Sequence, residues 1–293
     1  MAKIIMIQGT SSGVGKSIFS TILCRIFKQD GYKVAPFKVQ NMSSNAHILR
    51  NGDKIARTQA ISAYACGLEP DFKMNPILLV PIENKIEVYI NGKYKGNMDR
   101  FKYEDIKNEI FREALNSFYK LCDENDIVVI EGAGSPVELN LIKNDIVNMG
   151  FAKKVNAPVL LISDISRGGI FASLYGTINL ISKEEQSIIK GIIINKFKGD
   201  VKYFEDGINI IEGICKKEVL GVLPYFEINI EDEDSLVDSG EMKTKEIIMN
   251  NLKCDKTEEM YIKYLEQQFD LLAKNFREHI NINKIYEILN VNS

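Results

Sequence analysis

The feature that most constrains the fold is a short apolar run that ends in a glycine-rich turn and then opens into an amphipathic segment. The run Ile4–Ile7 leads to Gly9-Thr-Ser-Ser-Gly-Val-Gly-Lys-Ser17, and a helical pattern begins at Lys16. A strand, a glycine loop and a helix in this order direct backbone N–H groups and the positive end of the helix dipole toward one point. The segment therefore predicts a polyphosphate site. A chance glycine-rich turn is the alternative, which the flanking pattern disfavours.

Individual residues of this loop have distinct expected roles in binding ATP. Lys16 is expected to neutralise the β- and γ-phosphates, and the Ser17 hydroxyl to ligate Mg²⁺. The spacing departs from the commonest pattern, because five residues rather than four separate Gly9 from Gly15, and Thr10 stands where the first glycine usually lies. The backbone of the loop completes the predicted nucleotide site, which comprises Gly9, Thr10, Ser12, Gly13, Val14 and Gly15.

Length and composition bound the class of protein. The chain has 293 residues, of which 45% are hydrophobic and 26% charged, so it can bury a core and is neither disordered nor fibrous. No apolar run approaches the roughly 18 to 20 residues of a membrane span, and the amino terminus lacks signal-peptide features. We expect a cytoplasmic protein without a membrane partner. The formal charge of -3 gives no general attraction to nucleic acid, so none is expected as a partner.

The cysteines do not predict a disulfide framework or a metal centre. They are odd in number, widely scattered, and include no pair at metal-ligand spacing. We expect reduced thiols in packed positions at Cys24, Cys66, Cys122, Cys215 and Cys254.

Apolar runs and helical patterns alternate along most of the chain, which predicts an α/β fold with a doubly wound, mostly parallel sheet of about seven strands. Glu87–Ile90, followed by Asn91-Gly92, predicts a hairpin on the edge of that sheet. The other expected strands are Ile4–Ile7, Val34–Val39, Ile127–Ile130, Pro158–Ile162, Gly191–Ile194 and Val219–Leu223. The expected helices are Lys16–Lys28, Ile55–Cys66, Tyr103–Cys122, Ile146–Val155 and Ile170–Ile181.

A change in texture after Tyr225 predicts a domain boundary. We assign 1–227 to the main domain, the acidic and polar stretch 228–256 to a linker, and 257–293 to a helical carboxy-terminal tail. The tail carries a single apolar face, which would dock on the main domain or on a partner subunit. That face comprises Tyr261, Leu265, Phe269, Leu272 and Phe276.

Three further positions at strand ends are candidates for the site. Glu131 follows a buried run and precedes a glycine turn, so it is placed to hold Mg²⁺. Lys38 would be a second cation for phosphate or an anionic substrate, and Asn195-Lys196 would read the adenine edge. The alternatives are a solvated carboxylate, an isolated surface lysine, and an asparagine selected by turn geometry.

Taken together, these segments closely resemble the amino-terminal domain of the cobyric acid synthase family, and more distantly dethiobiotin synthetase. The resemblance covers about the first 225 residues and rests, besides the loop, on six segments. They are Ala35-Pro-Phe-Lys-Val-Gln-Asn-Met-Ser43, Met74-Asn-Pro-Ile-Leu-Leu79, Glu131-Gly-Ala-Gly-Ser-Pro136, Asp145-Ile-Val-Asn-Met-Gly-Phe-Ala152, Arg167-Gly-Gly-Ile-Phe-Ala-Ser173 and Asn195-Lys-Phe-Lys-Gly-Asp200.

The resemblance implies a P-loop NTPase-like, dethiobiotin synthetase-like fold and ATP-dependent amidation of corrinoid carboxylates, adenosylcobyrinic acid a,c-diamide becoming adenosylcobyric acid. ATP would phosphorylate the carboxylate, and ammonia would attack the acyl phosphate. Lys16, Lys38 and Glu131 would then be catalytic, and related enzymes imply a homodimer. Substrate contacts are expected at Gln40, Asn41, Ser43, Asn75, Asp164 and Arg167.

The sequence departs from the family in its glutaminase region. Family members carry a glutaminase domain that needs a nucleophilic Cys on a glycine-rich elbow and a His base. Cys215 lacks the following glycine, and neither His47 nor His279 lies in a catalytic setting, so we expect no glutaminase activity. The end of the chain resembles the family's own carboxy terminus, which suggests an internal deletion. Ammonia would then come from solution or from a separate glutaminase subunit.

Two departures affect the synthetase region itself. Lys54 stands where the family has an acidic residue, with Asp53 one position earlier as a substitute Mg²⁺ ligand, and Val80 stands where a lysine is expected. These changes favour a second hypothesis, a catalytically impaired nucleotide- or corrinoid-binding protein that acts as a regulator or partner. A third hypothesis is another ATP-dependent ligase or carboxylase resembling dethiobiotin synthetase.

Overall fold

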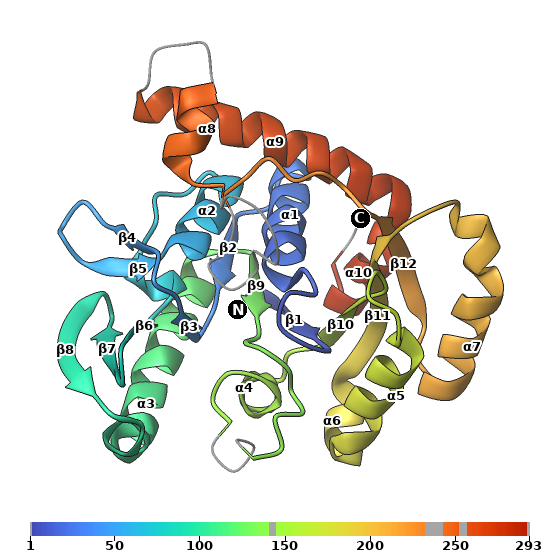
Figure 1. The fold of residues 1–293 in the computed structure, drawn as a ribbon, viewed down its shortest axis with the longest axis horizontal. Helices are drawn as coiled ribbons and strands as arrows, with labels where there is room; N and C mark the ends of the chain where they lie inside the picture. The colour runs from blue at the N-terminus through green and yellow to red at the C-terminus, as the bar shows by residue number, and fades with distance from the viewer. Residues whose placement is uncertain (1, 141–144, 232–242, 252–256, 292–293) are drawn as a thin grey trace. The chain divides into compact units, whose positions relative to one another are not determined.

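The computed structural model describes residues 2–140, 145–231, 243–251 and 257–291 (Figure 1). The chain divides into two compact units. The first comprises 1–2, 21–128 and 228–273, and the second comprises 3–20, 129–227 and 274–293.

The principal sheet has six strands in the order β12-β11-β10-β1-β9-β2. Within the second unit β1 pairs in parallel with β10, β10 with β11, and β11 with β12. This arrangement confirms a doubly wound, mostly parallel α/β fold. The strand bounds are β1 (Lys3–Gly9), β2 (Val34–Phe37), β9 (Ile127–Glu131), β10 (Val159–Asp164), β11 (Ile189–Phe197) and β12 (Val219–Pro224).

The apolar continuity of these strands follows from burial on both faces. All five residues of β9 are buried, as are Val159–Ser163 in β10 and Ile5–Gly9 in β1. Every predicted strand of this group is present. The sheet has six strands rather than about seven, because the expected edge hairpin belongs to a different sheet.

That hairpin is part of a four-stranded sheet in the first unit, with the order β3-β6-β7-β8. β7 (Lys85–Ile90) and β8 (Lys93–Met98) are antiparallel neighbours, and β6 (Ile77–Ile82) lies on the other side of β7 (Figure 1). Asn91 and Gly92 have φ of 49° and 78°, as a tight two-residue hairpin turn requires. The turn was predicted correctly, but its place on the edge of the principal sheet was wrong, because the hairpin pairs with β6, which in turn pairs with β3 (Gln40–Met42).

Short strands also precede the second helix. β4 (Ala46–Ile48) and β5 (Lys54–Ala56) form an antiparallel pair, so Ile55, expected in a helix, lies in a strand. The helices are α1 (Lys16–Gln29), α2 (Arg57–Cys66), α3 (Arg100–Glu124), α4 (Met149–Val155), α5 (Ile170–Leu180), α6 (Lys183–Ile188), α7 (Glu205–Cys215), α8 (Lys245–Asn251), α9 (Glu258–His279) and α10 (Ile282–Leu289), with short 3₁₀ turns η1 (Phe72–Met74) and η3 (Val201–Phe204). No described helix is both long enough and apolar enough to cross a bilayer.

The predicted apolar face of the tail is buried. Tyr261, Leu265 and Phe269 are each 0% exposed, and Leu272 and Phe276 are 5% and 3% exposed. In the second unit Phe276 packs on Phe19, with ring centroids 5.5 Å apart.

The domain boundaries themselves stay a prediction. Residues 232–242 and 252–256 of the expected linker, and with them Cys254, lie outside the described residues. The other four cysteines are free and buried.

A buried polar cluster in the first unit joins the start of α2 to the segment before α8. Arg57 Nε lies 3.0 Å from Glu231 Oε2, and the Tyr261 hydroxyl donates to Glu231 Oε1. Arg57 also donates to His47 Nδ1 over 2.7 Å. Because a guanidinium can only donate, this ring nitrogen must be unprotonated. Burial, together with the adjacent Arg57 charge, lowers the pKa of His47 from 6.5 to about 4.

We expect this cluster to make stability dependent on pH. Between pH 6.5 and about 4 the unfolded chain binds a proton at His47 that the folded chain does not, so the free energy of unfolding falls as the pH is lowered through this window. The upper limit is ~3 kcal/mol, and solvent screening of this half-buried ring reduces the expected loss to about 1 to 2 kcal/mol. Urea unfolding of the wild type and of His47→Asn, which keeps an acceptor but cannot titrate, at pH 7 and pH 4.5 measures the difference. Equal losses in both proteins would contradict the assignment.

Candidate functional site

The predicted phosphate-binding loop lies in the second unit between β1 and α1. Gly13 and Gly15 adopt φ of 74° and 101°, values that side chains other than hydrogen rarely tolerate. Thr10 N–H donates to Ile162 O of β10 over 3.0 Å, which ties the start of the loop to the adjacent strand. The helix that follows begins at Lys16. The observed strand, loop and helix agree with the sequence pattern.

Side chains from the carboxyl ends of β10 and β11 hold the loop in shape. Asn195 Nδ2 donates to Val14 O and Lys196 Nζ to Gly13 O, each over 2.8 Å. The Thr10 and Ser163 hydroxyls lie 2.9 Å apart. The Asn195 and Lys196 contacts engage carbonyl groups of the loop and so fix its backbone before a ligand arrives. The Asn195 amide, proposed to read adenine, contacts the loop itself in this structure.

Lys196 also forms an ion pair with Asp164, their Nζ and Oδ2 atoms being 2.8 Å apart. Burial alone would raise the pKa of Asp164, but hydrogen bonds from Lys196 and Ser166 outweigh it and hold the pKa below its usual value. The carboxylate therefore stays charged at neutral pH and keeps the Lys196 ammonium directed at the loop. Asp164 was expected to contact substrate, whereas here it contacts Lys196 and the Ser166 N–H.

Lys16, Ser17 and Glu131 form the part of the site suited to phosphate and metal. Ser17 Oγ donates to Glu131 Oε1 over 2.7 Å, and Glu131 is only 3% exposed. Lys16 Nζ donates to Ser11 O over 2.9 Å and to Gly134 O over 2.8 Å. Carbonyl oxygens thus occupy positions that phosphate oxygens would take around this ammonium.

Ser17 and Glu131 fit a Mg²⁺ ion that is bound together with a nucleotide. Mg²⁺ prefers oxygen ligands and is commonly held by one or two protein groups, phosphate oxygens and water. A hydroxyl and a carboxylate 2.7 Å apart provide two such oxygens. Among the described residues no cluster of three or more His, Cys, Asp or Glu could hold a metal alone, so the remaining ligands would be phosphate and water.

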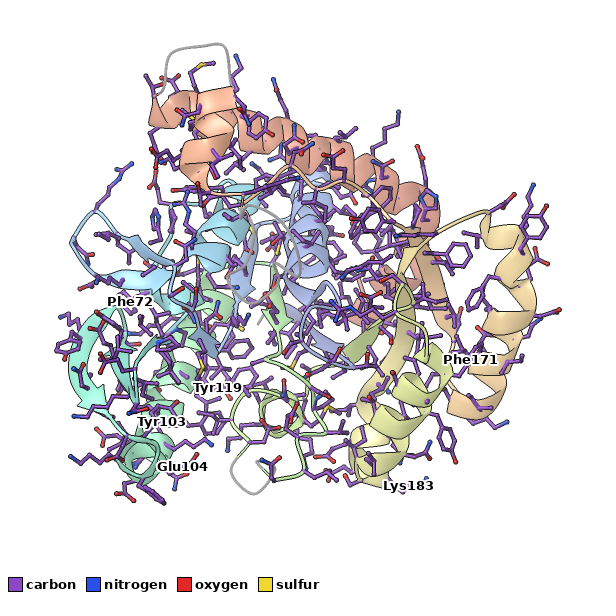
Figure 2. The ribbon with its side chains drawn as sticks, in the orientation of Figure 1. Phe72, Tyr103, Glu104, Tyr119, Phe171 and Lys183 are labelled. Carbon is purple, nitrogen blue, oxygen red and sulfur yellow. The ribbon has the colours of Figure 1, made fainter. Side chains whose placement is uncertain are left out.

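The other candidate residues, except Arg167, belong to the first unit. Lys38 follows β2 and is 4% exposed, and its carbonyl accepts from Asn75 Nδ2 over 3.1 Å. Asn41 Nδ2 donates to Thr58 Oγ1 over 3.0 Å. The hydroxyl of Tyr103, which Figure 2 labels on α3, donates to Gln40 Oε1 (Figure 2). Asparagine and glutamine side chains in this segment therefore make internal contacts.

Three candidates remain. Ser43 Oγ bonds the backbone of Asn45, and Asp53 is half-buried and accepts from Asn51 Nδ2 over 2.8 Å. Arg167 is exposed in the turn before α5. The second unit therefore brings together the loop, Glu131, Asp164, Asn195 and Lys196. The first unit holds Lys38, Gln40, Asn41, Ser43, Asn75 and Asp53.

The two departures from the family pattern lie close together in the first unit. Lys54 Nζ lies 3.3 Å from the Tyr89 hydroxyl, which in turn donates to Glu87 Oε2 over 2.8 Å. Val80 pairs with Glu87 across β6 and β7 and packs against Ala56, Leu78 and Tyr89. Lys54 is thus linked to Glu87 through a tyrosine hydroxyl, and Val80 fills a small apolar cluster.

Asn148, to which no role was assigned from the sequence, lies against the turn after Glu131. Asn148 Oδ1 accepts from Ala133 N–H, and Nδ2 donates to Ala133 O and Ser135 O. Its segment, Asp145–Ala152, stood out only as part of the resemblance. Local periodicity does not indicate a contact with a turn so far along the chain.

A strand, glycine loop and helix that present Lys16 and Ser17 beside a buried carboxylate define a P-loop nucleotide-binding protein of the α/β class. Residues 5–237 match the family model described as CobQ/CobB/MinD/ParA nucleotide binding domain. The chain belongs to this family.

Curated relatives carry a more specific name. A cobyric acid synthase of Lachnoclostridium phytofermentans is 51% identical over 249 residues, which is 83% of this chain and 48% of the relative. Another, from Clostridium kluyveri, is 53% identical over 235 residues, 80% of this chain and 47% of the relative. The chain thus spans about half the length of the curated relatives it matches.

Solved structures show a more distant likeness. The signal recognition particle 54 kDa protein of Aeropyrum pernix, in complex with GDP, is 16% identical with a TM-score of 0.44, and the match covers 93% of this chain and 50% of that one. The MinC:MinD complex of Aquifex aeolicus gives 15% identity and a TM-score of 0.44, covering 78% and 84%. At these scores the likeness carries no functional inference.

A substitution at Gly15 tests whether the loop held by Asn195 and Lys196 is the nucleotide site. An added Cβ would lie 2.3 Å from Asn195 Nδ2 on a residue with φ of 101°, so Gly15→Ala must displace the clamp. We expect ATP affinity, measured by calorimetry, to fall by at least about tenfold, the equivalent of ~1.4 kcal/mol. Gly176→Ala, on α5 with open space around the added carbon, is the matched control and should leave affinity unchanged. Equal affinities in all three proteins would rule out this loop.

Proposed function

We propose that the chain is a carbon–nitrogen ligase that uses ATP to amidate carboxylates of a corrinoid, adenosylcobyrinic acid a,c-diamide being converted to adenosylcobyric acid. The observation that carries this proposal is the grouping of Lys16, Ser17 and Glu131 in a chain about half identical to cobyric acid synthases over four-fifths of its length. The family match supports nucleotide binding. The similarity to cobyric acid synthases supports a corrinoid carboxylate as the second substrate.

The reaction would proceed in two transfers. A carboxylate oxygen of the corrinoid attacks the γ-phosphorus of ATP, the bond to the β,γ-bridging oxygen breaks, and ADP leaves. Ammonia then attacks the carbonyl carbon of the acyl phosphate, the C–O bond to phosphate breaks, and the nitrogen loses a proton. Phosphorylation is needed because a free carboxylate is a poor electrophile. Phosphate is a better leaving group than the hydroxide that a free carboxylic acid would have to release.

The chain's own residues would act mainly through charge and position. Lys16 would exchange its carbonyl partners, Ser11 O and Gly134 O, for oxygens of the transferred phosphoryl group. Ser17 and Glu131 would hold Mg²⁺, which when bound neutralises charge on the phosphates. Lys38, which is 4% exposed, is proposed to act in the same transfer as part of the segment Ala35–Ser43.

The ammonia is proposed to come from outside this chain. Among the described cysteines, Cys215 is buried, and burial raises the pKa of its thiol, which is opposite to what a nucleophilic thiolate needs. His279 bonds the backbone of Asn275 through Nδ1 and stacks edge-on against Phe226. These surroundings support the expectation that ammonium, or a separate glutaminase subunit, supplies the nitrogen.

A catalytically impaired nucleotide- or corrinoid-binding protein is the second candidate. Lys54 and Val80 favour it, since each lacks the charge that the family pattern places there. Under this alternative the loop would still bind ATP, because the contacts that hold the loop come from Lys16, Asn195 and Lys196.

Product analysis separates the two candidates. Purified protein is incubated with Mg²⁺-ATP, adenosylcobyrinic acid a,c-diamide and either ammonium or glutamine, and the corrinoid is analysed by mass spectrometry. We expect amidated product with ammonium and none with glutamine alone. Lys16→Met should lower turnover by about 100-fold or more, because it removes a charge from the phosphoryl group, while Lys28→Met at the end of α1 serves as the control. Phosphate release without amidated corrinoid would rule out the ligase.

The two departures can be reversed together. Lys54→Glu with Val80→Lys restores the charges of the family pattern, and we expect turnover to rise if these positions meet substrate or metal. A group that holds or orients a metal ligand is typically worth about 10- to 100-fold in metal affinity or activity. The comparison is made at saturating ATP, with urea unfolding to confirm that the Val80 cluster tolerates the lysine. Unchanged turnover in a stable variant would show that neither position acts in the reaction.

A further inference from the structure

The turn that follows Glu131 is held by a side chain with no role in the function proposed above. Asn148 is 6% exposed and makes three hydrogen bonds to the turn, to Ala133 N–H over 2.9 Å, Ala133 O over 2.7 Å and Ser135 O over 3.1 Å. One carboxamide thus satisfies both polar groups of Ala133 and closes across to Ser135. It fixes the turn on both sides of Gly134.

The position of Asn148 in the chain makes this contact unusual. Asn148 is the N-cap residue of α4, where an asparagine ordinarily bonds the N–H groups of its own first turn. Here it makes no such bond, and Asp145 takes that role, accepting from Asn148 N–H and Gly150 N–H, each over 2.8 Å. The carboxamide of Asn148 is thereby available to the turn.

The turn is also too close to its neighbours to shift easily. A Cβ at Gly132 would lie 2.4 Å from Gln8 Oε1 and 2.7 Å from Asn148 Oδ1, so the backbone of the turn lies directly against both side chains. Gly132 N–H donates to Ile7 O of β1 over 2.9 Å. β1 and Asn148 therefore both hold the four-residue turn 132–135.

Two groups of the site depend on the position of this segment. Glu131, directly before it, accepts from Ser17, and Gly134 within it holds Lys16 through its carbonyl. A displacement of the turn would therefore move both the Glu131 carboxylate, which would hold Mg²⁺, and Gly134 O, which accepts from Lys16. Misplacement of such groups by about 1 Å is enough to reduce function strongly.

We propose that Asn148, released by Asp145, is a positioning residue that sets the Glu131 carboxylate for the nucleotide-bound Mg²⁺. The inference rests on the proposed metal role of Ser17 and Glu131. It does not depend on the corrinoid or on ammonia. Its consequence is that loss of the Asn148 carboxamide weakens the contribution of Mg²⁺ to ATP binding more than ATP binding itself.

The test compares the affinity for ATP with Mg²⁺ and with EDTA by calorimetry, in the wild type, Asn148→Ala and Asn148→Asp. The aspartate has nearly the same shape and can still accept from Ala133 N–H, but as a carboxylate it lacks both donors to Ala133 O and Ser135 O. In both variants we expect the Mg²⁺-dependent gain in affinity to shrink by about 10-fold or more, with the affinity in EDTA changed by less than about threefold. Asn179→Ala, which removes a similar carboxamide bond to Tyr175 O on the exposed face of α5, is the matched control.

Each outcome decides a different point. If the variants lose thermal stability but keep the full Mg²⁺ gain, Asn148 is structural only and the proposal is overturned. If Asn148→Ala does not fold, the isosteric Asn148→Asp decides alone. Glu131→Gln should abolish the Mg²⁺ gain; if it does not, the proposed metal site is overturned and the role of Asn148 with it, whereas a gain lost in Glu131→Gln but kept in the Asn148 variants overturns the role of Asn148 alone. Absence of corrinoid amidation leaves this measurement unaffected.

Discussion

The backbone of the phosphate-binding loop depends on carbonyl groups that are held by side chains from other strands. Asn195 and Lys196 bond two consecutive carbonyls, Val14 O and Gly13 O, while the Lys16 ammonium bonds Ser11 O. A loop with two glycines at positive φ has many alternative conformations, and these bonds select one of them. A nucleotide that enters this site loses little free energy to ordering of the loop. The conformation has already been set by folding.

These bonds also give charge a defined place. Asp164 forms an ion pair with Lys196, and the Lys196 ammonium holds the loop by donating to Gly13 O. The Lys16 ammonium instead bonds the carbonyl oxygens of Ser11 and Gly134. Exchange of carbonyl dipoles for phosphate oxygens is favourable because the interaction becomes one between full charges. The two lysines beside this loop therefore differ in their contacts, since Lys196 pairs with the Asp164 carboxylate and Lys16 bonds carbonyl oxygens of the backbone.

The parts of this arrangement that could be predicted from the sequence are those carried by local pattern. The loop, the buried strands and the apolar face of α9 follow from glycine spacing, continuous apolar runs and helical periodicity, and each is present. Outside the predicted hairpin, the four-stranded sheet and the separate pair β4-β5 were not predicted, since β3, β4 and β5 have three residues each and too little alternation to be recognised. Asn195 is predicted to contact the nucleotide, and in the folded chain its amide also donates to Val14 O, a contact that the sequence does not reveal. Asn148 was missed for the same reason.

Asp145 and Asn148 show how a helix start can serve a distant turn. Capping of α4 requires one acceptor, and either residue could provide it. Because Asp145 bonds the N–H groups of Val147, Asn148 and Gly150, the helix start loses nothing when Asn148 turns away. The neutral carboxamide suits the turn, since it must both accept and donate, which a carboxylate cannot do. The order of the two residues is therefore chemically determined: exchange of the acid and the amide would place three acceptors against one another beside Glu131.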